Sequence, residues 1–264
     1  MSDRPVVVIT GASAGIGRAT AVRFAREGAN VVLAARSQER LERLAERLEE
    51  RFSVETLVAQ CDVREHEDLD ALVETAIARF GRIDVLVNNA GFGLYGRVED
   101  TPEGAFRDLL ETNVLGTHQA IRAVLPHMRR QGSGHIVNVG SVVGKRSWPY
   151  HGAYAASKFA LTGLTQALRG ELAGSGVTVS LVLPASTDTE FFANAPTYSP
   201  EYVPAPLGPV QTPGQVARAI VRSVQRPSPE VHMQPLMRIA HVLGDVFPGL
   251  TAWASELHYR WLQR

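Results

Sequence analysis

Short apolar runs alternate with helical patterns along most of this chain. The runs are rich in Val, Ile and Leu without strict alternation of apolar and polar residues, which is typical of strands buried on both faces of a parallel sheet. Six strands are predicted in this way, at Val6–Thr10, Val31–Ala35, Val54–Ala59, Ile83–Asn88, His135–Gly140 and Val177–Leu183.

The segments between these strands have the period of amphipathic helices. In Glu39–Glu50, the residues Leu41, Leu44, Ala45 and Leu48 share one face, and Glu and Arg fill most other positions. The segment is too short for a coiled coil, so we expect this face to pack on a sheet. Repeated strand–helix–strand units require right-handed crossovers. The chain is therefore predicted to be an α/β protein with a doubly wound parallel sheet flanked by helices.

Composition narrows the range of partners. The 264 residues can bury a large core without disulfides or a metal, and 27 basic residues balance 27 acidic ones, so no nucleic acid is expected to bind. The single cysteine, Cys61, fits a reducing cytoplasm, and the eight histidines show no metal-ligand spacing with it. No apolar stretch approaches the ~18 residues of a membrane span, so no integral membrane segment is expected.

A glycine-rich segment follows the first predicted strand. It reads Thr10-Gly11-Ala12-Ser13-Ala14-Gly15-Ile16-Gly17 and leads into a helix. Glycine lets the backbone turn tightly and approach a pyrophosphate, and the helix start offers free N–H groups to the phosphates. The spacing is Gly-x3-Gly-x-Gly, not the more familiar Gly-x-Gly-x2-Gly. Its place between a strand and a helix favours dinucleotide binding over a purely structural turn.

The second predicted strand ends where such a fold meets the adenosine ribose. An Asp or Glu there would bond the ribose hydroxyls and repel a 2′-phosphate. This chain has two alanines followed by Arg36 and Ser37, which can both donate hydrogen bonds to a phosphate. We therefore predict NADP(H) in preference to NAD(H). The alternative is that Arg36 is a solvated side chain and Ser37 only caps the next helix.

Asp62, which follows the third predicted strand, is a further candidate at the adenosine end. Its carboxylate would accept a hydrogen bond from the adenine amino group. The alternative is a carboxylate that stabilises the start of the helix near Glu65.

Tyr154 and Lys158 are four residues apart in a predicted helix from about Gly152 to Ala173. Residues i and i+4 share a helix face, so the phenol and the ammonium can lie side by side. A free tyrosine has a pKa near 10, and a neighbouring cation lowers it by roughly 1–3 units. An oxidised nicotinamide would add to this effect. The pair therefore fits proton exchange with a substrate oxygen, although a Tyr-x3-Lys pair alone is more often a surface feature.

The ordered set of motifs resembles the short-chain dehydrogenase/reductase family, in its shorter single-domain branch, over about residues 5–234. The resemblance rests on Thr10–Gly17, Asn88-Asn89-Ala90-Gly91, Asn113, Ser141, Tyr154 with Lys158, and Pro184–Thr189. It implies a Rossmann-like fold and an oxidoreductase that moves a hydride between NADP(H) and a ketone or aldehyde, or the corresponding alcohol.

The resemblance also implies a catalytic set of four residues. Tyr154 would be the general acid in reduction and the general base in oxidation, and Lys158 would lower its pKa and hold the nicotinamide ribose. Ser141 would donate to the substrate oxygen, and Asn113 would hold a water that links Lys158 to solvent. The residues alone leave simpler roles open: Ser141 serves a turn, and Asn113 is a helix asparagine bonded to backbone.

The same resemblance implies the residues that contact the cofactor. They are Gly11, Ser13, Gly15, Ile16, Gly17, Arg36, Ser37, Asp62, Asn89, Ala90, Gly91, Tyr154, Lys158, Pro184, Thr187 and Thr189. Ile16 would lie near the nicotinamide, and Thr189 with the Thr187 backbone would contact its carboxamide. The chain departs from the family at Ala185, where glycine is usual, and at Ala14, where many NADP-using relatives have a basic residue.

The loops that should form the substrate site are rich in large apolar residues. They carry Phe92, Leu94, Tyr95, Trp148, Phe191, Phe192 and Tyr198. This predicts an apolar substrate, such as a lipid-like, steroid-like or aromatic ketone, unless these residues only pack a lid. The proline-rich stretch Pro196–Pro213 is predicted to be a loop or small lid. His151 either touches substrate or simply begins the helix of Tyr154.

We expect residues 1–234 to form one dinucleotide-binding and catalytic domain, and residues 235–264 to form a C-terminal helical extension. Its apolar residues favour packing on the chain itself or on a partner subunit, in a homodimer or homotetramer, over a membrane surface. Two other functions stay open. One is a 3-oxoacyl-thioester reductase, which would need a basic patch for an acidic carrier. The other is a non-catalytic, NADP-binding regulatory protein.

Overall fold

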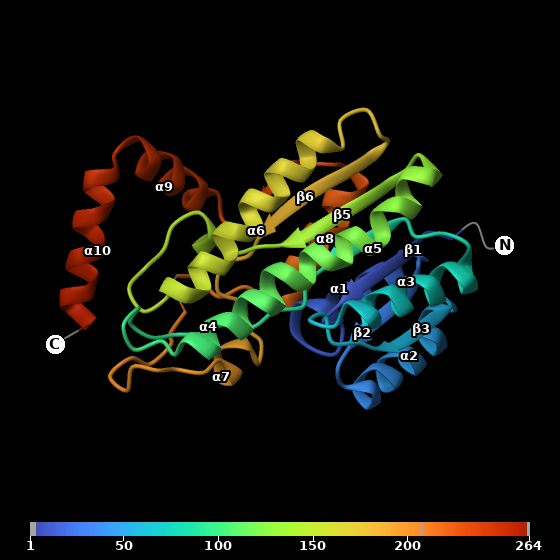
Figure 1. Ribbon diagram of the computed structural model, residues 1–264, viewed down its shortest axis with the longest axis horizontal. Coiled ribbons are helices and arrows are strands. Elements are labelled where there is room, and N and C mark those ends of the chain that lie inside the picture. Colours follow the sequence, from blue (N-terminus) through green and yellow to red (C-terminus); the bar gives the residue numbers. More distant parts are fainter. Residues whose placement is uncertain (1–3, 207, 263–264) are drawn as a thin grey trace.

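The computed structural model describes residues 4–206 and 208–262. Its centre is a seven-stranded parallel sheet with the strand order β3-β2-β1-β4-β5-β6-β7 (Figure 1). The strands are β1 (Val6–Thr10), β2 (Asn30–Ala35), β3 (Thr56–Gln60), β4 (Val85–Asn88), β5 (Gly134–Val139), β6 (Val177–Leu183) and β7 (Glu230–His232). The chain order reverses between β1 and β4, and in such sheets ligands bind outside the carboxyl ends of the strands at that point.

Helices cover both faces of the sheet. They are α1 (Gly15–Arg26), α2 (Gln38–Phe52), α3 (His66–Phe80), α4 (Glu103–Leu110), α5 (Gly116–Gln131), α6 (Gly152–Glu171), α7 (Phe191–Asn194), α8 (Pro213–Gln225), α9 (Pro235–Val246) and α10 (Pro248–Leu262). The first face packs against α1, α2 and α8, and the second against α3, α5 and α6. The expected Rossmann-like, doubly wound α/β fold is confirmed.

Successive strand residues feed two separate hydrophobic cores. In β1, Val7 and Ile9 belong to the core under α1, α2 and α8, whereas Val6 and Val8 belong to the core under α3, α5 and α6. All four side chains are buried. A strand buried on both faces has no need of polar residues at alternate positions, which accounts for the continuous apolar runs in the sequence.

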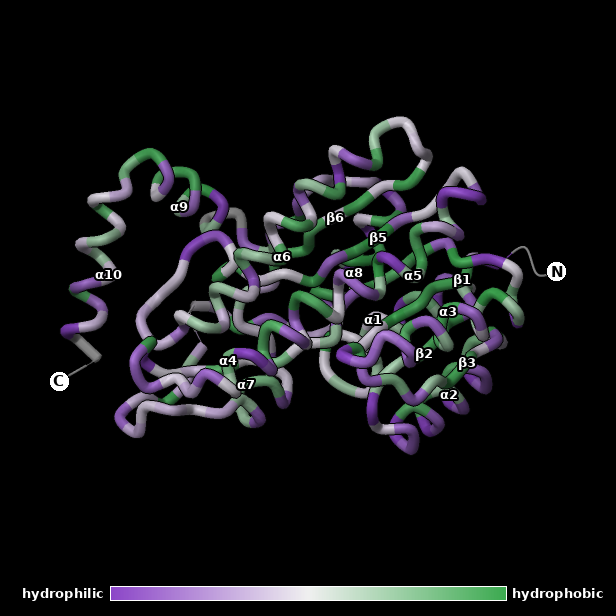
Figure 2. Tube along the Cα trace, in the orientation of Figure 1, coloured by the Kyte–Doolittle hydropathy of each residue, from purple (hydrophilic) through white to green (hydrophobic). Residues whose placement is uncertain are grey.

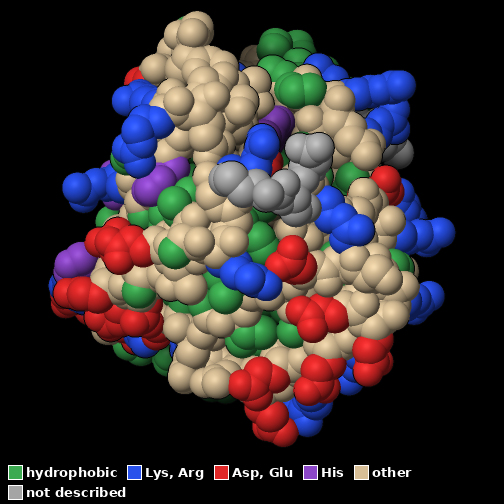
Figure 3. Space-filling model, turned by 90° about the vertical axis from the view of Figure 1, so that its right-hand side faces the viewer, with side chains coloured by type: hydrophobic (Ala, Val, Ile, Leu, Met, Phe, Trp, Pro, Cys, Tyr) green, Lys and Arg blue, Asp and Glu red, His purple; other side chains and the backbone are tan. Residues whose placement is uncertain are grey.

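The hydropathy along the chain follows these layers. The central strands form a hydrophobic band, and α2 shows hydrophilic residues on its outer side (Figure 2). On the face turned toward the viewer in Figure 3, acidic and basic side chains are interspersed. This mixture agrees with the equal numbers of acidic and basic residues in the chain.

The structure corrects several predicted boundaries. The strand predicted from Val54 begins at Thr56, the one predicted from Ile83 begins at Val85, and the one predicted to end at Gly140 ends at Val139. The edge strand β7 was absent from the sequence prediction, because three residues are too few to show a pattern. Within the described residues, no helix is long and apolar enough to span a membrane.

The C-terminal segment forms the two helices α9 and α10, which arch away from one end of the sheet (Figure 1). The segment is tied to the rest of the chain through the loop before α6. The Arg146 guanidinium donates to the Thr251 hydroxyl at 2.8 Å, and the rings of Trp148 and His258 meet edge to face at 5.7 Å. The division into a domain of residues 1–234 and an extension stays a prediction.

Candidate active site

The glycine-rich segment forms a tight turn between β1 and α1. Gly11 and Gly15 have φ angles of +65° and +51°, in the left-handed region that favours glycine. A side chain at Gly17 would collide with the Gly11 carbonyl oxygen and the Asn89 amide, and one at Gly15 would lie 3.1 Å from Thr189. The turn is therefore a cradle that only glycine leaves open. Residue Ala14 at the start of α1 has no side-chain acceptor for the helix N–H groups.

Two side chains brace this turn against the end of β4. The Asn89 amide donates to the carbonyl oxygens of Thr10 and Gly11, at 3.0 and 3.2 Å. In return, the Thr10 hydroxyl accepts from the N–H groups of Asn89 and Ala90, at 3.0 and 3.1 Å. The predicted Asn88–Gly91 segment therefore holds the phosphate turn in place, which is partly a structural role.

A cleft of about 890 Å³ runs along the carboxyl edge of the sheet and begins at this turn. It brings together most of the predicted site residues. Its walls include Gly11, Ser13, Gly15, Ile16, Arg36, Ser37, Asp62, Asn89, Ala90, Gly91, Ser141, Tyr154, Lys158, Pro184, Thr187 and Thr189. Gly17 and Asn113 do not line it. Gly17 shapes the turn from behind, and Asn113 is buried beneath the wall.

Basic and hydroxyl side chains gather at one end of the cleft. Arg36 directly follows β2 and is exposed. The Ser37 side chain makes no capping hydrogen bond to α2, so the alternative that Ser37 only caps this helix is not observed. Arg40, in the first turn of α2, also lines this end and pairs with Glu190 at 3.3 Å. Arg40 was not singled out from the sequence, although its place four residues after Arg36 on the same side was a usable signal.

Asp62 lies at the same end but is held by a neighbour. Its carboxylate accepts from the Arg64 guanidinium at 2.6–3.1 Å and from the Arg64 N–H at 3.1 Å. The hydrogen bond from Arg64 holds the pKa of the Asp62 carboxyl below its usual range. The Asp62 carboxylate is therefore ionised at neutral pH. An adenine amino group that donates to it, as predicted, would share this acceptor with Arg64.

The predicted acid/base pair lies at the other end of the cleft, on the first turns of α6. Tyr154 and Lys158 are both buried, with 8% and 6% of their surface exposed. The Lys158 Nζ donates to the Val139 carbonyl oxygen at 3.1 Å and lies 5.8 Å from the centre of the Tyr154 ring. Burial lowers the pKa of Lys158 to about 8. The ammonium therefore lies beside the phenol in a poorly solvated site.

The pKa of Tyr154 shifts in the direction opposite to the sequence expectation. Burial raises it well above the usual value, and the hydrogen bond with the Ser141 hydroxyl acts in the lowering direction. The sequence predicted that the Lys158 ammonium would lower the pKa of Tyr154. In the structure, Lys158 is not among the groups that shift this pKa. The physical reason is that an uncharged phenol costs less to bury than a phenolate.

Ser141 lies two residues after the end of β5, at the start of a 3-10 turn over Val142–Gly144. Its hydroxyl oxygen accepts from the Val143 N–H at 3.3 Å, so the turn role considered for it is present. Its side chain also lines the cleft. Both roles are compatible, because a hydroxyl that accepts from backbone still has its own hydrogen to donate.

Asn113 is placed by an irregularity in a long helix. Between α4 and α5, the segment Glu111–Leu115 forms a π-helical turn, a feature that often marks functional sites. The Asn113 amide donates to the Phe92 carbonyl oxygen at 3.0 Å and to the Ser157 hydroxyl at 3.1 Å, and its oxygen accepts from the Phe92 N–H at 3.0 Å. The backbone-bonded role is therefore observed, and the water-holding role stays a prediction. Ser157 was missed from the sequence.

The loop after β6 closes the cleft opposite the glycine turn. The Thr187 hydroxyl donates to the Ala185 carbonyl oxygen at 2.9 Å. The Thr189 hydroxyl accepts from the Phe191 N–H at 3.2 Å, and the Thr189 methyl group faces Gly15. The loop therefore keeps its local hydrogen bonds although Ala185 replaces the family's usual glycine.

Aromatic residues surround the end of the cleft near Tyr154. The walls there include Phe92, Tyr95, His151, Phe191 and Phe192. The rings of Tyr154 and Phe191 are 5.5 Å apart, and Tyr95 stacks on Phe192 at 6.2 Å. The predicted apolar loops therefore meet around the acid/base pair.

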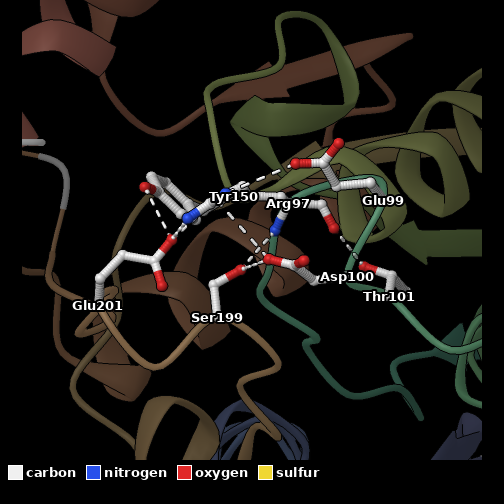
Figure 4. Close-up of polar contacts among 7 residues, drawn as sticks. All are labelled: Arg97, Glu99, Asp100, Thr101, Tyr150, Ser199 and Glu201. Carbon is white, nitrogen blue, oxygen red and sulfur yellow. Dashed lines mark hydrogen bonds and ion pairs between the residues drawn. The ribbon is translucent and has the colours of Figure 1, made fainter.

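A lid segment near residues 196–202 packs against the loop after Tyr95 (Figure 4). Arg97 pairs with Glu201, and its N–H donates to the Ser199 hydroxyl at 2.9 Å, which in turn donates to Asp100 at 2.6 Å. Tyr150, with a φ of +65°, also donates to Glu201 at 3.4 Å. The first part of the predicted proline-rich lid is thus held by ion pairs and hydrogen bonds.

Comparison with known proteins agrees with this geometry. A family model described as "short chain dehydrogenase" matches residues 5–198. An uncharacterized oxidoreductase of Bacillus subtilis (strain 168), YxnA, is 35% identical over 249 residues, which cover 93% of this chain and 70% of that protein.

Solved structures show the same architecture. A short-chain dehydrogenase from Sphingobium yanoikuyae in complex with NADPH has a TM-score of 0.80 and 34% identity, covering 94% of this chain and 95% of the other. A short-chain dehydrogenase/reductase from Burkholderia phymatum in complex with NAD has a TM-score of 0.84 and 28% identity, with the same coverage of 94% and 95%. With the matching family model and the relative that spans most of the chain, these likenesses show that the protein is an oxidoreductase belonging to the short-chain dehydrogenase/reductase family.

Proposed function

We propose that this protein interconverts a ketone or aldehyde and the corresponding alcohol with NADP(H), by a Tyr154, Lys158, Ser141 and Asn113 set. The observation that carries the proposal is one continuous cleft. A buried tyrosine–lysine pair lies at one end, and a glycine cradle with Arg36 lies at the other.

The protonation state of Tyr154 suits the reduction direction. Burial keeps its phenol protonated at neutral pH, so it can give its proton to a carbonyl oxygen. The Ser141 hydroxyl hydrogen-bonds Tyr154 in the protein alone, and it would donate to the same carbonyl oxygen once the substrate takes that place. Lys158 offers a positive charge beside the phenol, which favours the phenolate that this transfer leaves behind.

The chain's own residues fit a dinucleotide. Gly11 and Gly17 let the turn pack closely on Asn89, Gly15 keeps the space beside Thr189 open, and the uncapped start of α1 offers its free N–H groups to a pyrophosphate at this turn. The bound cofactor would supply the hydride and, when oxidised, a positive charge near Tyr154. NADP(H) is favoured over NAD(H) by Arg36 and Ser37, because they take the positions directly after β2 where an acidic residue would repel a 2′-phosphate.

An apolar substrate is favoured by the aromatic walls around Tyr154. Phe92, Phe191 and Phe192 line this part of the cleft, and Lys158 Nζ is turned to the Val139 carbonyl oxygen. A strongly charged substrate would be desolvated there without a matching counter-ion.

The test is NADPH oxidation with a panel of carbonyl compounds, repeated with Tyr154→Phe. We expect turnover of aromatic or other apolar ketones and a loss of at least about a hundredfold in kcat for Tyr154→Phe, the scale of general acid catalysis. Tyr202→Phe is the matched control, because Tyr202 belongs to a neighbouring aromatic cluster and does not line the cleft.

Unchanged turnover in Tyr154→Phe would contradict the proposed mechanism. NADPH binding without turnover of any carbonyl compound would favour the non-catalytic alternative. Preference for small polar ketones would contradict the apolar substrate class.

A further inference from the structure

Two polar atoms face the aromatic end of the cleft without a partner in the protein. They are the Tyr95 hydroxyl and the Nε2 atom of His151. Both residues line the cleft, and only 1% of Tyr95 and 5% of His151 is exposed. Neither atom makes a hydrogen bond with any residue in the described parts of the chain. Neither atom is among the buried unpartnered atoms of the described residues, so both reach the solvent of the cleft, and a ligand that displaces this water must replace its hydrogen bonds.

The local bonds of His151 define what its free nitrogen can do. Its Nδ1 lies 3.0 Å from the Pro149 carbonyl oxygen, which can only accept, so Nδ1 carries the hydrogen. Burial lowers the pKa of His151, so the ring is neutral at pH 7. A neutral ring with its hydrogen on Nδ1 has a lone pair at Nε2. This atom is therefore a hydrogen-bond acceptor.

Tyr95 supplies the complementary group. Burial raises the pKa of its phenol far above neutral pH, so the hydroxyl keeps its hydrogen. The Tyr95 and His151 rings meet edge to face, with centres 4.9 Å apart and planes at 80°. The Tyr95 ring centre is also 6.5 Å from that of Tyr154. Tyr95, which offers a donor, and His151, which offers an acceptor, thus lie close to Tyr154, the proposed proton donor.

A hydroxyl group matches this pair. Its oxygen can accept from Tyr95 while its hydrogen is donated to His151 Nε2, so one ligand group satisfies both. A carboxylate or phosphate could accept from Tyr95, but it would meet the lone pair of a neutral imidazole instead of a donor. The surrounding phenylalanines would also leave the anion without solvation.

We propose that Tyr95 and His151 together bind a hydroxyl group of the substrate. The substrate class is then an uncharged, apolar or aromatic ketone that carries a hydroxyl away from its reacting carbonyl, or the corresponding diol. This inference rests on the proposed function and makes it more specific. Tyr95 and His151 determine specificity in it and take no part in the proton transfer.

The test compares acetophenone with 2-, 3- and 4-hydroxyacetophenone in the wild type, Tyr95→Phe, His151→Phe and the control Tyr202→Phe. The measured quantity is the ratio of kcat/KM for each hydroxylated ketone to that for acetophenone. Intrinsic reactivity differences cancel when this ratio is compared between proteins. For at least one isomer, we expect the ratio to fall about tenfold in Tyr95→Phe and His151→Phe and to stay within about twofold in Tyr202→Phe.

The kinetic result separates a polar contact from a packing effect. Equal losses for acetophenone and its hydroxylated forms would mean that Tyr95 only packs the cluster, and would overturn the inference. Unchanged ratios for all three isomers in both variants would overturn it too. The two variants remove different partners of the same hydroxyl, so one that does not fold leaves the other as a test.

Equilibrium binding distinguishes failure of the inference from failure of the proposed function. The dissociation constants of the same four ketones are measured by calorimetry with the wild type and the same variants. If no ketone is reduced, the proposed function fails. The inference still holds if the wild type binds one hydroxylated isomer more tightly than acetophenone and both variants lose that preference. Absence of any preference in binding overturns it.

Discussion

Lys158 is a buried ammonium whose position costs stability at neutral pH. Its pKa is about 8 in the fold against an ordinary value near 10.5, so the unfolded chain binds more protons between these values. The cost is therefore full below pH 8 and declines as the pH rises toward 10.5. We expect Lys158→Met to unfold at higher urea than the wild type at pH 7, and the difference in free energy of unfolding to shrink by about 2 kcal/mol by pH 9.5.

The matched control for this prediction is Lys145→Met, because Lys145 is paired with Glu230 at 2.5 Å. Removal of this partner should destabilise the fold at both pH values. A difference between Lys158→Met and the wild type that stays constant from pH 7 to 9.5 would mean that Lys158 is not titrating in this range. Such a stability cost is expected where a proposed catalytic site needs a charge in a poorly solvated place.

Arg36 is the residue on which the proposed preference for NADP(H) depends. It lines the cleft directly after β2 and is exposed, so its guanidinium is available to a 2′-phosphate. We expect Arg36→Gln to raise the KM for NADPH roughly 10- to 100-fold, the scale of a lost hydrogen bond to a charged group, and to leave the KM for NADH within about threefold. Arg51→Gln, at the far end of α2 and outside the cleft, is the control.

The elements show which features of the site a sequence can predict. Tyr154 and Lys158 were predicted as neighbours because an α-helix fixes the i, i+4 geometry, and the glycine turn was predicted because few residues tolerate its backbone. The π-helical turn at Glu111–Leu115 had no such local signal, since its residues suit an ordinary helix. The raised pKa of Tyr154 was also missed, because burial depends on residues far away in sequence.

The π-helical turn anchors the loop after β4 through Asn113. Its side chain bonds both the N–H and the carbonyl oxygen of Phe92, and its oxygen lies where a Cβ on Gly91 would come within 2.7 Å. We expect Asn113→Ala to lower the free energy of unfolding by about 2–3 kcal/mol, because two part-buried backbone groups of Phe92 lose their partner. Urea unfolding followed by circular dichroism measures this.

The neighbouring residue provides the control for that prediction. Thr112 is half-buried, and its hydroxyl makes a solvent-exposed hydrogen bond to the Asp108 carbonyl oxygen in the preceding turn, so Thr112→Ala should change stability by less than about 0.5 kcal/mol. Equal effects of Asn113→Ala and Thr112→Ala would show that the π-helical turn is not held by the Asn113 side chain.

At the scale of the whole molecule, α9, α10 and the residue between them expose a large apolar surface. Its eight large side chains are each at least 48% exposed: Ile239, Val242, Leu243, Val246, Phe247, Leu250, Trp253 and Leu257. In α9 the four residues recur at intervals of three and four, which places them on one side of the helix. Exposed patches of this size on one chain mark an interaction surface.

The area of this face fits the homo-oligomer predicted from the sequence. The eight side chains expose on the order of 900 Å², and two copies packed face to face would bury roughly twice that, within the range of stable interfaces. We expect a dimer at 10 µM and above by sedimentation velocity, and a monomer for the double variant Leu250→Glu with Trp253→Glu, because each charge would lie in the centre of the contact. Val98→Glu, at an isolated exposed valine, should stay dimeric. A monomeric wild type that floats with phosphatidylcholine vesicles would instead assign the face to a membrane surface.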